Sequence, residues 1–164
     1  MVNMEKIKHD EKRIIEVEVN EKGDKIYIPM DDARFYDKFL EMFNNVISSA
    51  EAVNGRINEI EKEYAGKEDF ESKWQRCKKI SAENVAFSNC AVEMVEMVFG
   101  KDALKKYFAD VYEKIPDYLP DTDGFMDFLE KITPVIDKMF GKKTQRKVID
   151  KSKMSQYQPQ NFGK

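Results

Sequence analysis

The sequence is poor in the residues on which most enzyme active sites depend. Histidine occurs once, as His9 in a polar N-terminal stretch. The sequence therefore does not predict a catalytic triad, a histidine general base or a metal site with several histidines. The seven glycines stand singly, so there is no glycine-rich loop to bind phosphate. We therefore expect a protein that is not an enzyme and that binds neither a cofactor nor a metal ion.

Cysteine is also scarce, with only Cys77 and Cys90 in the chain. Both fall within one predicted helix, where a spacing of thirteen residues points them in different directions and prevents them from pairing. We expect two buried, reduced thiols, as in a protein of a reducing compartment, and keep an intermolecular or reactive role as the alternative.

Long apolar runs are missing as well. No run approaches the ~18 residues that a membrane span needs, and residues 1–6 lack the apolar block of a signal peptide. These observations predict a cytoplasmic protein with no membrane contact.

The 164 residues fit one domain of ordinary size, and their charge is unevenly distributed. Seven basic residues against one acidic residue give residues 141–164 a charge of +6, which leaves −9 on the first 140 residues. We expect a flexible N-terminus at 1–11, a single helical domain at 12–140 and a disordered basic tail at 141–164. Nucleic acid is not expected to bind the acidic body, whereas the tail is a candidate for contacts with phosphate.

A β-hairpin is predicted near the N-terminus. Apolar residues alternate with glutamates in residues 15–19 and recur at Ile26 and Ile28, on either side of a turn-like segment at 20–24. Pro29 ends the second strand. Because an isolated two-stranded hairpin is marginal in water, helices or a second chain must cover its apolar face.

A long helix is expected to follow, capped by Asp31 or Asp32 and ended by Gly66. Its apolar residues recur at alternating steps of three and four, which is a heptad stripe. Asn54-Gly55 interrupts the pattern outside the stripe, so we interpret it as a weak point within one helix. The stripe consists of Tyr36, Phe39, Phe43, Val46, Ala50, Val53, Ile57, Ile60 and Tyr64.

Three more helices are predicted, which gives a mainly α fold: an N-terminal β-hairpin followed by a four-helix bundle-like domain with a long helical hairpin. The second helix runs from Phe70 to Gly100, with small residues that let a neighbouring backbone approach at Ser81, Ala82, Ala86, Ser88 and Ala91. Asp102 is expected to cap a third helix that Pro116 ends. A fourth helix, capped by residues 121–123, runs to Phe140 with a kink near Pro134.

The long stripe has two interpretations. It is either the buried seam of an intramolecular helical hairpin or a surface that pairs copies of the chain or binds a partner helix. Nine methionines would make such a surface adaptable if it were open. The candidate partner-binding residues are Phe39, Phe43, Val46, Val53, Phe87, Met94, Met97, Val98 and Phe99.

Three segments carry a resemblance to a known family. Ile26-Tyr-Ile-Pro-Met-Asp-Asp-Ala-Arg-Phe35 leads a strand into a long helix, Asn89-Cys-Ala-Val-Glu-Met-Val-Glu-Met-Val-Phe-Gly100 is an apolar helix ended by Phe-Gly, and Asp102-Ala-Leu-Lys-Lys-Tyr-Phe108 follows it. Over residues 12–140 the chain resembles the tail assembly chaperones of long-tailed phages and of prophages in Gram-positive bacteria.

The resemblance implies a protein that keeps the tape-measure protein soluble in the host cytoplasm while the tail tube assembles, and that is absent from the finished virion. It also implies that copies of the chain associate, with edge pairing of the hairpin as one route, and that a frameshifted longer form can exist. The basic tail has no counterpart in this family.

Two other functions remain open. An acidic, phage-encoded inhibitor could occupy the nucleic-acid site of a host defence protein by charge mimicry, and the −9 body permits this. A small phage structural or adaptor protein is the other alternative.

Overall fold

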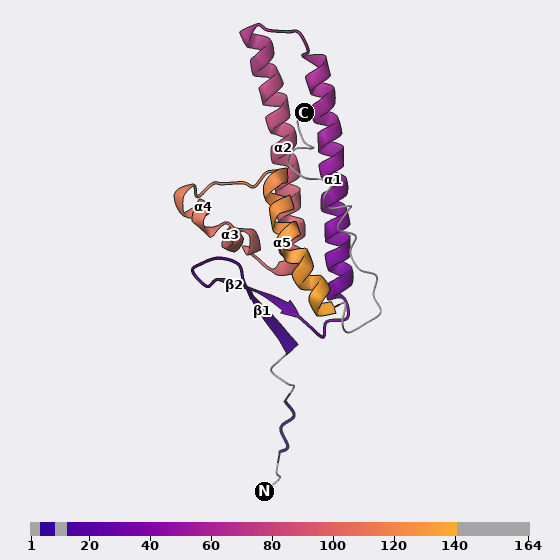
Figure 1. The fold of residues 1–164 in the computed structure, drawn as a ribbon, viewed down its shortest axis with the longest axis vertical. Coiled ribbons are helices and arrows are strands. Elements are labelled where there is room, and N and C mark those ends of the chain that lie inside the picture. The colour runs from indigo at the N-terminus through magenta and orange to yellow at the C-terminus, as the bar shows by residue number, and fades with distance from the viewer. Residues whose placement is uncertain (1–3, 9–12, 141–164) are drawn as a thin grey trace.

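A computed structural model describes residues 4–8 and 13–140. It confirms a mainly helical chain that begins with a two-stranded antiparallel hairpin (Figure 1). Residues 4–8 are exposed and have no regular structure. His9 and the basic tail lie outside the described residues. The elements are β1 (Ile14–Glu18), β2 (Lys25–Pro29), α1 (Phe35–Glu63), α2 (Phe70–Phe99), α3 (Ala103–Tyr107), α4 (Ala109–Lys114) and α5 (Thr122–Phe140).

The hairpin has the predicted alternation and is covered by helices of its own chain. Ile15 is paired with Ile28, and Val17 with Ile26, so these four side chains share one face of the sheet. Ile26 and Ile28 are fully buried and belong to the main hydrophobic core. The apolar face of the hairpin therefore needs no second chain to shield β2.

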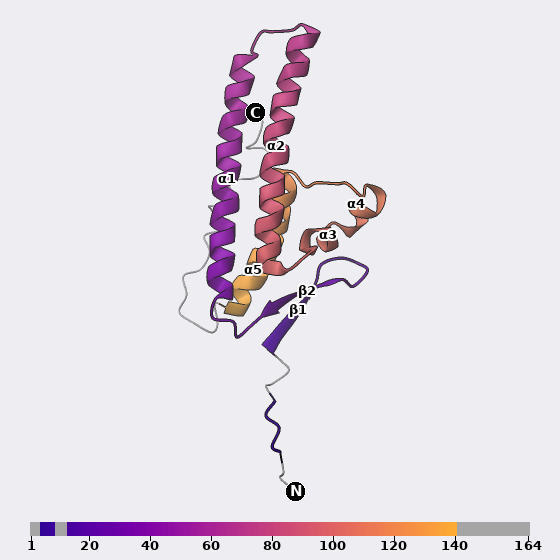
Figure 2. The ribbon, with the colours of Figure 1, turned by 180° about the vertical axis from the view of Figure 1, so that it is seen from behind.

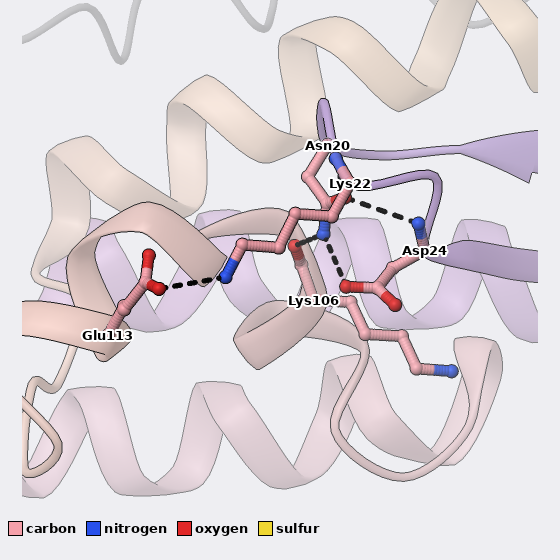
Figure 3. A network of polar contacts seen from close by, with 5 residues as sticks. All are labelled: Asn20, Lys22, Asp24, Lys106 and Glu113. Carbon is pink, nitrogen blue, oxygen red and sulfur yellow. Dashed lines mark hydrogen bonds and ion pairs between the residues drawn. The ribbon is translucent and has the colours of Figure 1, made fainter.

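Polar contacts attach the turn of the hairpin to the short helices (Figure 3). The Asn20 side-chain oxygen accepts hydrogen bonds from the backbone N–H groups of Lys22 and Asp24, which shapes the turn. The Asn20 amide nitrogen donates to the Lys106 carbonyl in α3 at 2.7 Å. Lys22 also pairs with Glu113 in α4 at 3.2 Å. These contacts fix the hairpin against the helical body.

The two long helices form the predicted antiparallel hairpin. Helix α1 continues through Asn54-Gly55 without a break, as expected. Its expected cap is wrong in detail. The N-cap residue is Arg34, whose side chain makes no capping hydrogen bond, and the Asp32 carboxylate accepts from the Arg34 backbone N–H in the turn before the helix. Helix α2 is capped by Asp69, which accepts from the Ser72 N–H at 3.0 Å, and it ends at Gly100.

The third helix differs from its prediction. Residues 103–114 form two short helices, α3 and α4, with the break at Phe108. The Phe108 ring packs against Tyr107 and Tyr118, with centroid distances of 4.7 and 5.7 Å, and this packing outweighs helical continuity. The expected Asp102 cap is also wrong, since Asp102 has a left-handed backbone (φ 63°) and its side chain makes no capping bond. Asp121, in contrast, accepts from the Gly124 N–H at the start of α5 as predicted.

Helix α5 packs on one half of the α1–α2 hairpin and completes the core (Figure 1). Phe125 and Phe128 of α5 meet Phe87 and Phe99 of α2 edge-to-face, at centroid distances of 5.6 and 5.5 Å. Between these rings Ala91 is fully buried, in agreement with the predicted close approach of another helix. Helix α5 continues through Pro134 to Phe140, as predicted.

The other half of the α1–α2 hairpin projects beyond α5 as a two-helix stalk, residues 54–86 (Figures 1 and 2). At ~1.5 Å per residue, the 29 and 30 residues of α1 and α2 span about 44 Å, whereas the 19 residues of α5 span about 28 Å. No residue of the stalk is buried. The buried residues that border it are Val53 in α1 and Phe87 in α2. The predicted stripe is therefore fully buried only as far as Val53, and its last three residues, Ile57, Ile60 and Tyr64, are half-buried.

Both cysteines are exposed, so the expectation of buried thiols is wrong. Cys77 lies in the stalk, where no third helix covers α2. Cys90 follows the buried residues Phe87 and Ser88 but lies on the outward face of α2. An apolar sequence pattern on α2 does not bury these thiols because α5 covers only one side of that helix over part of its length.

Candidate protein-binding surface

The nine candidate partner-binding residues fall into two groups. Six of them lie in the core of the single chain: Phe39, Phe43, Val46, Val53, Phe87 and Phe99. In this conformation they contact other residues of the same chain. Met94, Met97 and Val98 line a groove between α1 and α2; Met97 is exposed, and Met94 and Val98 are half-buried against the core. Binding of a partner by any of the nine stays a prediction, and Met97 is the most accessible of them.

We call this hollow the methionine groove. It has a volume of about 270 Å³, and residues from both long helices line it. Buried Met42 contributes from α1, whereas Met97 is 82% exposed on α2. A partner would therefore cover an apolar side chain that the chain itself leaves in water. The lining residues are Lys38, Glu41, Met42, Asn45, Met94, Met97 and Val98.

Helical spacing brings these residues together. The four lining residues of α1 recur at steps of three, one and three, and those of α2 at steps of three and one, so each set lies on one helical face. Lys38 and Glu41 add one charge of each sign. Neither has an ion-pair partner among the described residues. The groove is thus apolar along its length and polar at its rim.

Two aromatic residues near the tip of the stalk are also exposed. Phe70 is 80% and Trp74 is 54% accessible, and they lie one turn apart at the start of α2. They are exposed because the stalk has only one helical partner, α1, and α5 does not reach it.

Ion pairs join α1 and α2 along the stalk. Arg76 of α2 donates to both carboxylate oxygens of Glu61 in α1, at 2.7 and 2.6 Å. These hydrogen bonds hold the pKa of the Glu61 carboxyl below its ordinary value. Arg56 of α1 also donates to the Glu83 carboxylate of α2, at 2.6 Å.

The most strongly perturbed ionisable side chain belongs to a structural cluster. Burial, together with the hydrogen bond that Tyr107 donates to Asp127 at 2.6 Å, raises the pKa of Tyr107 to about 12. Burial alone would raise the pKa of Asp127, but hydrogen bonds from Lys131 and Tyr107 outweigh it and lower that pKa. The cluster consists of Tyr107, Asp127 and Lys131 and joins α3 to α5.

Within residues 4–8 and 13–140, no group of three or more His, Cys, Asp or Glu side chains is arranged to hold a metal ion. None of the helices in this part of the chain combines the length and hydrophobicity of a membrane span. Comparisons with protein-family models, with curated proteins and with solved structures find no match to this chain. The methionine groove and the stalk therefore have to be interpreted from their own geometry.

Proposed function

We propose that this chain is a non-catalytic protein that covers an apolar helical segment of another polypeptide. The observation that supports this most directly is the exposure of Met97 beside an apolar groove of about 270 Å³. An amphipathic helix that lies in such a groove places its own apolar residues against the lining side chains. Methionine suits this role because its unbranched side chain adapts to partners of different shape.

The client that the family resemblance names is the tape-measure protein of a long-tailed phage. Long helices with exposed apolar stripes associate with one another unless another surface covers them. Under this proposal the chain acts as a tail assembly chaperone in the bacterial cytoplasm: it holds the client until tail-tube subunits enclose it and is then released.

The stalk counts against the alternative of an acidic inhibitor. Charge mimicry of nucleic acid needs a continuous acidic face. Glu61 and Glu63 of α1 are instead each paired with a basic residue of α2, and Glu83 of α2 is paired with Arg56 of α1. An adaptor role in the virion would use the same groove. It differs in its outcome, because an adaptor stays in the purified particle.

Co-expression with the tape-measure protein encoded beside this chain tests the proposal. We expect the client to be insoluble alone and soluble with the chain, and to be recovered at least ten-fold less with Met97→Asp. Ile115→Asp is the matched control, since Ile115 is 55% exposed at the end of α4, outside the groove. Equal recovery with both variants would contradict the proposal, and binding to a nuclease that weakens steeply with salt would favour the inhibitor.

A further inference from the structure

The outer edge of β1 has backbone groups that no described residue pairs. The Met30 N–H donates to the Arg13 carbonyl at 2.8 Å, and the Val19 N–H to the Asp24 carbonyl at 3.0 Å, so the odd-numbered residues of this strand face β2. In an antiparallel pair the residues between them face the other way. The N–H and C=O groups of Ile14, Glu16 and Glu18 consequently point away from the hairpin, along a free edge.

The outer edge of β2 is blocked by comparison. Pro29 has no N–H to donate, and the Lys25 carbonyl already accepts a hydrogen bond from the Lys106 side chain at 3.2 Å. Of the outward-facing residues of β2, only Tyr27 has both backbone groups without a partner in the described part of the chain. A third strand can therefore form hydrogen bonds with three successive outward-facing residues of β1, but with only one residue of β2.

A second apolar hollow, the strand groove, lies where β1 meets α5. Its volume is about 270 Å³, slightly below the ~300 Å³ at which small-molecule pockets begin, which fits a few peptide side chains. No β2 residue lines it, so it opens on the free side of β1. The lining residues are Val17, Glu18, Val19, Tyr107, Phe128, Lys131, Ile132 and Val135.

The edge and the strand groove specify the same kind of ligand. A residue of an added strand that lies opposite Val17 points to the same face of the sheet as Val17, toward the apolar lining. Its neighbours lie opposite Glu16 and Glu18, whose carboxylates are exposed. Lys25 pairs with Glu16 at 2.7 Å, whereas Glu18 has no ion-pair partner among the described side chains. Basic residues in the added strand would complement both carboxylates.

We propose that the β1 edge binds an extended segment of another protein as a third strand, with apolar side chains at alternate positions in the strand groove and lysine or arginine between them. A second copy of β1 is a poor occupant. The antiparallel register that pairs the whole strand with its copy places Glu16 opposite Glu16, and like charges directly opposite each other are destabilising. This inference uses none of the residues of the methionine groove.

Hydrogen exchange of the full chain with the synthetic peptide Lys-Val-Lys-Val-Lys-Val-Lys tests the proposal. We expect the peptide to slow exchange of the Glu16 and Glu18 amides at least ten-fold and to leave the Val17 amide unchanged, because its N–H faces β2. A peptide with glutamate in place of lysine should have no effect. Equal protection by both peptides would overturn the charge argument.

Paired proline variants separate edge binding from loss of fold. Glu16→Pro removes a free donor of β1 and should abolish peptide binding, whereas Tyr27→Pro makes the matching change on β2 and should leave it intact; circular dichroism confirms that both fold. Three results would overturn the proposal: binding unaffected by Glu16→Pro, amides of Glu16 and Glu18 already protected without peptide, or protection that appears only as the chain dimerises.

Discussion

The difference between Val46 and Met97 is one of environment, although both lie on apolar helical faces. Val46 and Val53 are buried in the α1 seam, whereas Met97 is exposed to water. A carboxylate at a buried position loses its hydration and gains no partner, which costs several kcal/mol. We expect Val46→Asp with Val53→Asp to unfold the chain and Met97→Asp to keep its helicity, as measured by circular dichroism. A folded double variant would show that the seam opens.

Gly55 offers a stabilising substitution at the residue scale. It lies inside α1, and a Cβ added there meets nothing within 4 Å. Since alanine favours a helix interior by roughly 0.5–1 kcal/mol over glycine, Gly55→Ala should raise the thermal midpoint.

Gly100→Ala is the control for this substitution, because its φ of 96° is one that side chains disfavour. We expect it to lower the midpoint in the same thermal melt. If both alanines shifted the midpoint in the same direction, the backbone conformations assigned to these two glycines would be incorrect.

Which apolar side chains are buried was only partly predictable from the sequence. The heptad spacing correctly placed Phe39, Phe43 and Val46 on one face, because a regular helix makes that face unavoidable. On α2, in contrast, Cys77 was expected to be buried and is exposed. Spacing identifies the face of a helix but not the length over which another element covers it.

At the scale of elements, the stalk is the part of the long hairpin with least support. Its apolar side chains are at most half-buried, and its surface ion pairs contribute little each. We expect amides of residues 54–86 to exchange faster than those of residues 87–99, although α2 is continuous across the boundary. Hydrogen exchange with mass spectrometry measures this, and uniform protection along α2 would contradict it.

Acid should loosen the stalk before the core. Hydrogen bonds from Arg76 lower the pKa of Glu61 from its ordinary 4.5, and the bonds that Asp69 accepts from Ser72 lower its pKa from 3.8. A lowered folded-state pKa stabilises the fold above the ordinary pKa, and this contribution is lost as pH falls through the folded value. We expect helicity of the stalk to decrease below about pH 4.5. Glu61→Gln should remove part of that dependence, which circular dichroism against pH would detect.

The existence of the elements was easier to predict than their breaks. The β-hairpin and the long helices have strong alternation or periodicity, and all of them are present. The interruption at Phe108 arises from contacts of its ring with Tyr118, which is ten residues away in the sequence. Local periodicity contains no information about such a contact. The strand groove was likewise invisible, since it joins β1 to a helix that begins more than a hundred residues later.

At the scale of the whole molecule, the two proposed binding surfaces share no lining residue. Effects of changes at independent sites usually add within ~0.3–0.5 kcal/mol, which is about two-fold in affinity. We expect Met97→Asp to leave peptide binding at β1 within that range, and Glu16→Pro to leave client recovery unchanged. Titration of each variant against both ligands measures this. Larger cross-effects would mean that the surfaces communicate through the core.

The exposed thiols of α2 affect how any association of this chain should be judged. Cys77 and Cys90 are both accessible to solvent, so air oxidation can join two molecules covalently. A dimer made in this way would imitate a native assembly in size-exclusion chromatography. Samples kept under dithiothreitol, or a double serine variant, would separate the artefact from genuine self-association. The same thiols, ~20 Å apart along one helix, also provide ready attachment points for a pair of fluorophores.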